Sequence, residues 1–217
     1  MDVQKYKILY KEGEAEISEK KSRFIAHIAP AQTEEEAQAF IEKIKKHTGM
    51  QGITAGHTVS EKSNQPCVVV MMGNQWTAGK PMLEVLTGQE LHNVVAVVTR
   101  YFGGTLLGTG GLIRAYTKST KEGIKESMVI EKCLGVMLSL TCDYTTSGKI
   151  QYLTATEHIP VLDTVYTDNV TFEMIVPVEE VGSVEKKFME ASMGKAVLKK
   201  GEETYYAEID GKISYDL

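Results

Sequence analysis

The residues after about position 131 constrain the fold most, because their hydrophobic patterns follow one another in a fixed order. Strand patterns and helix patterns alternate as strand, helix, strand, strand, helix, strand, in the segments 134–144, 145–158, 159–178 (two strands turning at Asp168-Asn169), 178–194 and 201–210. This βαββαβ order predicts a ferredoxin-like domain, in which the helices cover one face of the sheet.

The preceding part of the chain also mixes strands and helices. Strand patterns fill 6–31 with a break at Gly13, and a buried strand is predicted at 93–102. Helices are predicted at 31–47, 80–86 and 112–127; Thr33 and Glu36 form a capping box, and Pro81 opens the second helix. We therefore expect an α+β protein of two domains, 1–130 and 131–217.

A glycine-rich segment, RYFGGTLLGTGGLIRAY (100–116), covers the end of the buried strand, a glycine loop and the start of the third helix. Strand, glycines and helix is the layout of a phosphate-binding loop. The known nucleotide motifs are absent, because Thr109 stands where a P-loop needs lysine and the dinucleotide fingerprint lacks its third glycine. Two interpretations stay open: backbone amides that bind an anion, or glycines that permit positive φ and close packing.

Arginine is rare in this chain, and its positions are informative. Of 24 basic residues only Arg23, Arg100 and Arg114 are arginines, and the last two flank the glycines. Arginine offers phosphate or carboxylate a planar bidentate fork that lysine lacks. Arg100 either binds an external anion or pairs with a buried carboxylate, and binding is the favoured role for Arg114. Tyr101 and Phe102 either stack on a base or belong to the core.

Charge and composition exclude several classes of protein. Residues 1–130 carry 16 Lys and Arg against 14 Asp and Glu, whereas 131–217 carry 8 against 15. A polyanion should therefore prefer the first part, although this small excess does not favour broad non-specific DNA binding. The chain has no apolar run of about 18 residues, and its three cysteines and five histidines show no metal-ligand spacing. We expect a cytoplasmic protein with no membrane partner, cofactor or metal.

Three motifs, KKSRFIA (20–26), TAGKPMLEVL (77–86) and VVTRYFGGTLLGTGGLIRAY (97–116), together with the βαββαβ segment, resemble the YigZ/IMPACT family. The resemblance implies a ribosomal-protein-S5-domain-2-like domain followed by a domain similar to the last domain of elongation factor G. Eukaryotic relatives regulate translation by relieving a kinase of the initiation pathway. Together with the glycines and arginines, this predicts an anion-binding surface made of Arg23, Lys80, Arg100, Tyr101, Gly103, Gly104, Gly108, Gly110, Gly111 and Arg114.

Two classes of function are compatible with this surface. The first is a non-enzymatic, translation-linked regulatory or binding protein that contacts RNA, the ribosome or an acidic protein partner. The alternative is a hydrolase-like enzyme that binds a small anion and uses the His, Cys and acidic segment of the family. The sequence gives no indication of the oligomeric state.

One segment departs from the family pattern. Where the family has motifs resembling D-A-T-H-N-C-x-A-Y and D-D-G-E-P-S-G, this chain has unrelated residues at 49–76. Codons for MQGITA (50–55), regrouped behind a G, can spell Asp-Ala-Arg-His-Asn-Cys, and MMGNQ (71–75) can spell Asp-Asp-Gly-Glu-Pro. We interpret 50–76 as a compensated double frameshift, which is either a sequencing error or a real mutation in the gene, with natural divergence as the alternative; resequencing the gene decides whether it is a sequencing error. No catalytic role is assigned to His57 or Cys67 in this segment.

Overall fold

The computed structural model describes residues 4–48, 53–59, 67–70 and 75–215, and for 53–59, 67–70, 75 and 76 only the backbone. The chain divides into two compact units, one of residues 6–131 and one of 132–217 with the N-terminal residues up to Lys5. The first unit contains β1 (Lys5–Lys11), β2 (Gly13–Glu19), β3 (Ser22–Pro30), α1 (Glu34–Thr48), β4 (Ile53–Val59), β5 (Cys67–Val70), a π-helical turn (Gln75–Gly79), α2 (Lys80–Gly88), β6 (Leu91–His92), β7 (Val94–Tyr101) and α3 (Gly108–Lys125). The strand β8 (Met128–Cys142) begins in this unit and continues into the second.

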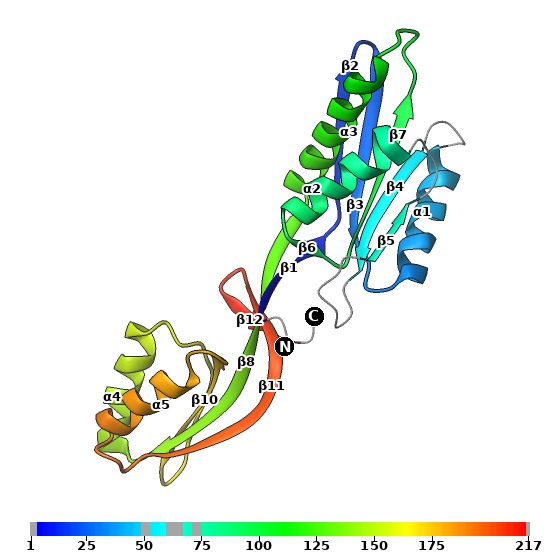
Figure 1. Ribbon diagram of the computed structural model, residues 1–217. Helices are drawn as coiled ribbons and strands as arrows, with labels where there is room; N and C mark the ends of the chain where they lie inside the picture. The colour runs from blue at the N-terminus through cyan, green and yellow to red at the C-terminus, as the bar shows by residue number, and fades with distance from the viewer. Residues whose placement is uncertain (1–3, 49–52, 60–66, 71–74, 216–217) are drawn as a thin grey trace. The chain divides into compact units, whose positions relative to one another are not determined.

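A five-stranded antiparallel sheet, in the order β2-β3-β7-β4-β5, forms the centre of the first unit. Helix α1 lies on one face of this sheet, and α2 and α3 lie on the other (Figure 1). Strand β1 pairs in parallel with the short β6. The helices therefore cover both faces of the sheet, which explains why its central strands are apolar on both sides.

Alternation along β3 and β7 distributes their side chains between these two faces. Phe24, Ala26 and Ile28 join the core under α2 and α3, whereas Ala29 joins the core under α1. On β7, Val94, Ala96 and Val98 face α3 and Val95 and Val97 face α1. Because successive side chains of a strand point to opposite faces, Arg100 continues the row on the α3 side.

The predicted N-cap of α1, Thr33, is confirmed, and the Glu36 side chain turns back as in a capping box but accepts from the N–H of Gln32 rather than that of Thr33. The backbone N–H of Glu36 donates to Thr33 Oγ1 over 3.2 Å, and the N–H of Gln32 donates to Glu36 Oε2 over 2.7 Å. Ala37 and Ile44 are the fully buried positions of the helix. The short helix predicted after Pro81 is also present, as α2.

Helix α3 begins earlier than the sequence pattern indicates, and the expectation of a loop up to residue 111 is wrong. Gly108, Gly110 and Gly111 lie in the first turn of the helix. Glycine in a helix costs about 1 kcal/mol relative to alanine. Leu107, Ala115 and Tyr116 are buried in the core on either side of this turn, and we attribute the early start to their packing.

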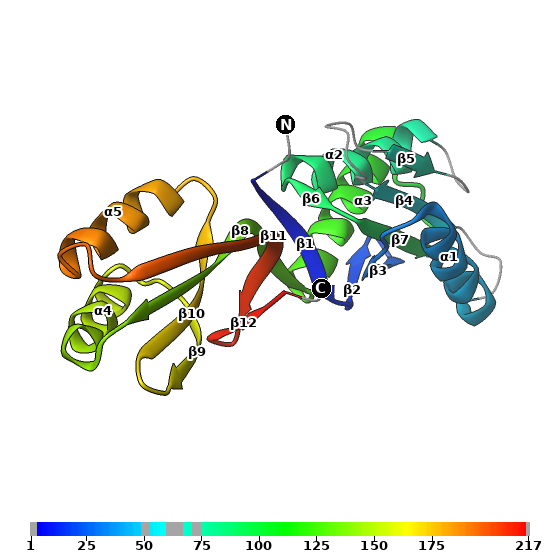
Figure 2. The same cartoon turned by 90° about the horizontal axis from the view of Figure 1, so that it is seen from below.

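The second unit has the βαββαβ order that the sequence predicts. Its elements after β8 are α4 (Tyr144–Thr156), β9 (Val161–Tyr166), β10 (Val170–Pro177), α5 (Val181–Ala191), β11 (Val197–Ile209) and β12 (Lys212–Ser214). The sheet order β9-β10-β8-β11 is antiparallel throughout, which is the ferredoxin-like arrangement, and β12 extends it beyond β11. Both helices pack on one face of this sheet (Figure 2).

Asp143 begins α4 in the second unit. Its carboxylate accepts a hydrogen bond from the N–H of Thr146 over 2.7 Å and another from the hydroxyl of Thr145, also over 2.7 Å. These hydrogen bonds lower the pKa of Asp143 to about 2.

Taken over both units, the fold class is α+β, as predicted. The pairing of Gln4 with Leu134, in which the Leu134 N–H donates over 2.8 Å, had no signal in the sequence.

Candidate anion-binding surface

Arg100 lies at the end of β7 on the α3 side of the sheet, where it is half-buried. Its guanidinium carbon is 5.5 Å from the ring centroid of Phe24 and 5.4 Å from that of Phe102. Its Nη2 donates to Ser22 Oγ over 3.4 Å, while Nε is buried without a hydrogen-bond partner among the described residues. No carboxylate of the described part of the chain forms an ion pair with Arg100. The guanidinium therefore contacts two aromatic rings and is not paired with an acid of the described residues.

Ser22 connects Arg100 to the glycine segment. Its hydroxyl oxygen also accepts the backbone N–H of Gly103 over 3.3 Å. A Cβ at Gly103 would lie 1.9 Å from the carbonyl oxygen of Lys21, so only glycine permits this approach between the segment and the β2–β3 turn. Lys20 and Lys21 form that turn with φ of 45° and 69°, and both are exposed. The close-packing interpretation thus holds for Gly103.

The other glycines serve a different purpose. Gly104 and Gly108 have φ of +80° and +67°, and a Cβ at either would meet nothing within 4 Å. Leu107 precedes α3 without a side-chain hydrogen bond to it, and the first turn of the helix contains no acidic residue. The first amides of a helix have no intrahelical partner and carry partial positive charge. Gly108 and Gly110 are exposed, so the N-terminus of α3 presents its backbone amides to solvent. No acidic side chain in the first turn of the helix competes with an external anion for these amides.

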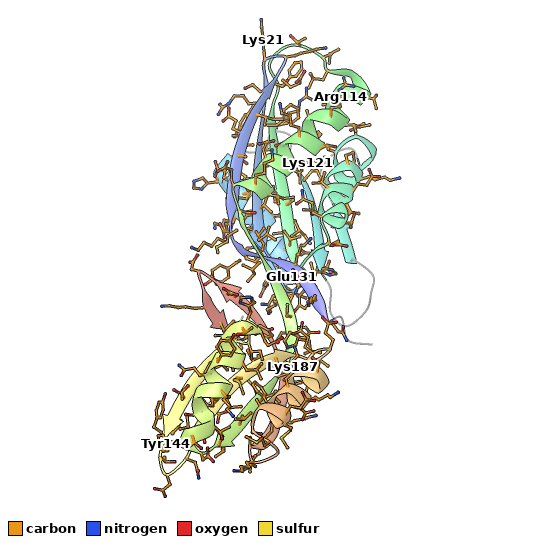
Figure 3. The ribbon with its side chains drawn as sticks, turned by 90° about the vertical axis from the view of Figure 1, so that its left-hand side faces the viewer. Lys21, Arg114, Lys121, Glu131, Tyr144 and Lys187 are labelled. Atoms are coloured by element: carbon orange, nitrogen blue, oxygen red, sulfur yellow. The ribbon has the colours of Figure 1, made fainter. Side chains whose placement is uncertain are left out.

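Arg114 is exposed on α3 one turn further along. The heavy atom nearest to a Cβ built at Gly110 is Arg114 Nη1, at 3.8 Å, so the guanidinium reaches back towards the start of its own helix. Within the described residues Arg114 forms no ion pair. Figure 3 shows Arg114 on α3 and Lys21 at the same end of the unit. Arg114 and the first-turn amides therefore form one exposed positive group.

Sequence reasoning missed the continuation of this positive charge along α3. Arg114, Lys118 and Lys121 are exposed at positions i, i+4 and i+7 of the helix, which places them on one side of it. Figure 3 shows Arg114 and Lys121 on α3. We call these three residues the basic α3 face. Further along, Glu122 pairs with Lys125 over 2.7 Å, and this contact lowers the pKa of Glu122. The helical spacing of the basic residues was the signal that could have revealed this face.

A shallow hollow of about 350 Å³ lies beside the basic α3 face, between α2 and α3. Lys121 and Thr117 line it from α3, and Glu84 and Val85 line it from α2. Lys80, at the start of α2, is exposed, but it is not among the residues that line the hollow. The hollow brings one carboxylate, that of Glu84, beside the far end of the basic α3 face.

The structure separates Arg23 and Tyr101 from this surface. They are cross-strand partners on the face of the sheet covered by α1, and the Arg23 guanidinium carbon is 5.6 Å from the ring centroid of Tyr101. Arg23 Nε and Nη2 each donate to a carboxylate oxygen of Glu16 over 2.7 Å, which lowers the pKa of Glu16 and raises that of Arg23. The Tyr101 hydroxyl donates to the Thr48 carbonyl over 3.3 Å. The ten expected residues therefore do not form one cluster.

A second hollow, of about 270 Å³, lies on the α1 side. Glu14 of β2 and His27 of β3 line it together with Glu12, which lies between β1 and β2, and Lys43 and His47 line it from α1. His27 Nδ1 is 3.2 Å from Glu14 Oε2, with the His27 side chain only 15% exposed. Burial lowers the pKa of His27 more than the neighbouring carboxylates raise it, so the contact is a hydrogen bond from neutral histidine at pH 7.

The alternative enzymatic site would lie in the segment where the family carries its His, Cys and acidic motifs, and the side chains of that segment are outside the described part of the structure. His57 falls in β4 and Cys67 in β5, and only their backbone pairing is described. The frameshift interpretation of 50–76 therefore stays a prediction. Among the described residues there is no group of three or more His, Cys, Asp or Glu that could hold a metal ion. No helix in that same part of the chain is long and apolar enough to span a membrane.

Comparison with known proteins gives consistent matches over both units. Residues 20–124 match the Impact N-terminal domain, and residues 140–195 match a domain of unknown function, DUF1949. The chain is 41% identical to the IMPACT family member YvyE of Bacillus subtilis over 194 residues, 89% of each protein. It is 30% identical to the IMPACT family member YigZ of Escherichia coli, over 82% of this chain and 89% of that protein. A crystal structure of a hypothetical protein superposes with a TM-score of 0.55 at 28% identity, covering 92% of this chain and 98% of the other.

Proposed function

Because the chain belongs to the IMPACT family, we propose that it is a cytoplasmic, translation-linked binding protein rather than an enzyme. Its first unit binds the phosphates of RNA, free or within the ribosome, through the exposed start of α3 and Arg114. The second unit provides a separate docking domain. The acidic protein partner and the small-anion enzyme are the competing outcomes of the test below.

The observation that carries this proposal is that no Asp or Glu of the described residues forms an ion pair with Arg114. Arg23, by contrast, is paired with the carboxylate of Glu16, and the half-buried Arg100 contacts Phe24, Phe102 and Ser22. Arg114 instead lies exposed beside the first-turn amides of α3, with no ion pair among the described residues. Helix amides and a guanidinium both bind phosphate oxygens well.

The charge distribution agrees with this assignment. The first 130 residues carry a small positive excess, and the remainder carries a negative one. The excess is concentrated on α3, where the basic α3 face adds two lysines to Arg114. RNA phosphates should therefore be attracted to this helix and repelled by the second unit.

Salt-dependent RNA binding tests the proposal. A mixed-sequence RNA of about 20 nucleotides is titrated with wild-type protein, Arg114→Ala and the matched control Lys149→Ala, whose lysine is exposed on α4. Arg114→Ala should weaken binding for all sequences and reduce the slope of log affinity against log salt by about one. Lys149→Ala should change neither.

Two results would contradict the proposal. If wild-type protein binds no RNA even at about 50 mM salt, the RNA assignment fails. If both variants weaken binding equally, the attraction is diffuse and α3 is not the binding surface. Wild-type protein that ignores RNA but binds an acidic polypeptide through Arg114 would support the protein-partner alternative.

A further inference from the structure

Two large apolar side chains are exposed in the segment that leads into α3. Phe102 is 58% exposed and Leu106 is 84% exposed, and both belong to the segment between β7 and α3. Exposed apolar residues are common singly, but an exposed aromatic ring next to clustered positive charge is a recurring feature of sites for single-stranded nucleic acid. A ring that stacks on a base must itself be supported by neighbouring side chains.

The Phe102 ring is the outer member of a packed row that leads to α3. The guanidinium of Arg100 contacts Phe102 and Phe24, at 5.4 Å and 5.5 Å from the two ring centroids. Phe24, which is fully buried, meets Tyr116 of α3 edge-on with 5.2 Å between centroids. Arg100 thus links the exposed Phe102 ring to the buried Phe24–Tyr116 pair, which reaches α3.

We propose that Phe102 stacks on an unpaired base while the basic α3 face contacts the neighbouring phosphates, so that the partner is single-stranded RNA. This inference rests on the RNA-binding function proposed above and specifies the form of RNA. It distinguishes Phe102 from Tyr101, which lies on the opposite face of the sheet beside Arg23.

The geometry of α3 suits a strand of phosphates. Along a helix that rises 1.5 Å per residue, Arg114 and Lys118 are about 6 Å apart and Lys118 and Lys121 about 4.5 Å apart. Long side chains on such a row can follow successive phosphates of one flexible strand. A strand that begins at the start of the helix and runs along the face would leave its first base beside Phe102.

A duplex fits this arrangement less well. Paired bases are stacked on one another, and proteins recognise double-stranded RNA mainly by its shape, its 2′-hydroxyls and its phosphates. The face of the Phe102 ring would then have no base to contact. An acidic polypeptide could neutralise the basic α3 face, but it offers no regular planar group for the ring.

The test separates the ring from the charges with four variants. Phe102→Leu keeps an apolar side chain without an aromatic face, Phe102→Trp enlarges the face, Leu106→Ala is the matched control for an exposed apolar residue, and Lys118→Ala removes a charge. The ligands are a 12-nucleotide uridine-rich RNA, the same backbone with abasic sites, a blunt duplex of the same length and polyglutamate.

We expect Phe102→Leu to weaken binding of the single-stranded RNA about tenfold with an unchanged salt slope, and to leave the abasic strand unaffected. Phe102→Trp should bind at least as tightly as wild type, and Leu106→Ala should bind like wild type. Lys118→Ala should lower affinity for both strands and reduce the salt slope. Unchanged melting temperatures establish that the variants are folded.

Several outcomes would overturn the inference. Phe102→Leu that binds like wild type, or a duplex bound as tightly as the single strand, removes the stacking role but leaves Arg114-dependent RNA binding intact. Loss of affinity in Leu106→Ala equal to that in Phe102→Leu would show a merely apolar contact. Wild-type protein that binds polyglutamate and none of the nucleic acids would refute both this inference and the proposed function.

Discussion

Replacing Gly103 by alanine should destabilise the first unit strongly, because the added methyl group has no space. The Cβ would lie 1.9 Å from the Lys21 carbonyl oxygen, 2.0 Å from its carbonyl carbon and 2.5 Å from the Ser22 nitrogen. All three atoms are backbone, so no side chain can rotate away. To reach an ordinary contact of 3.4 Å, the segment and the β2–β3 turn must separate by about 1.5 Å.

The separation would also break polar contacts. Ser22 Oγ accepts from the Gly103 N–H and from Arg100 Nη2, and both bonds depend on the present distance. Forcing an extra carbon into a packed region costs about 1–3 kcal/mol, and each hydrogen bond adds about 1 kcal/mol. We therefore expect a loss of about 3–5 kcal/mol in the free energy of unfolding of the first unit. For a unit of this size the loss corresponds to a fall of about 10–20 °C in melting temperature.

Scanning calorimetry of the full chain measures this fall, and Gly110→Ala is the matched control. Gly110 lies in the same glycine-rich segment, in the first turn of α3, and the nearest atom to its added Cβ is the flexible Arg114 Nη1 at 3.8 Å. Since alanine favours a helix over glycine, this variant should melt at or slightly above the wild-type temperature. A Gly103→Ala protein that melts within 2 °C of wild type would refute the close-packing argument.

Two further predictions concern pH. Burial lowers the pKa of His27 in the folded state, so the unfolded chain binds the proton more readily. The free energy of unfolding should therefore fall as pH drops below about 6.5. Urea unfolding of wild type and His27→Gln between pH 5 and 8 measures this fall, which should be smaller in the variant. The pKa of Asp143 is lowered to about 2, so its contribution to stability is fully present above about pH 4 and is lost as pH falls through 2. Asp143→Ala should destabilise the second unit at pH 7, whereas Asp143→Asn should retain most of the cap. Thermal melts at pH 7 and pH 2.5 should show a clearly smaller difference between wild type and Asp143→Ala at the lower pH.

The described geometry also changes the role expected for each arginine. One residue type in three places suggested one site, yet Arg23 is paired with Glu16, Arg100 contacts Phe24 and Phe102, and only Arg114 is exposed without an ion pair in the described residues. Sequence spacing cannot distinguish these cases. Arg23 and Arg100 lie near the ends of adjacent strands, and alternation sends their side chains to opposite faces of the same sheet.

The order of strands and helices could be predicted from the sequence because each element leaves a local pattern of apolar residues. The period of apolar residues and the capping box of Thr33 and Glu36 predicted α1, and the alternation of strands and helices predicted the ferredoxin-like second unit. Hydrophobic periodicity survives in the sequence because each element must bury one face. The start of α3 could not be predicted from the sequence, because the tertiary packing of Leu107 and Tyr116 outweighs the low helix propensity of three glycines.

By itself, the sequence determined which segments are strands and helices and which glycines and arginines lie near one another along the chain. Only the tertiary structure decided that Gly103 is a point of close contact, that Phe102 rather than Tyr101 is exposed beside α3, and that Arg114 continues into a basic face. The physical reason is that local patterns record burial along one element. Which side chain meets which neighbour depends on strand register and on how closely the elements approach, and those are set by contacts between residues distant in the sequence.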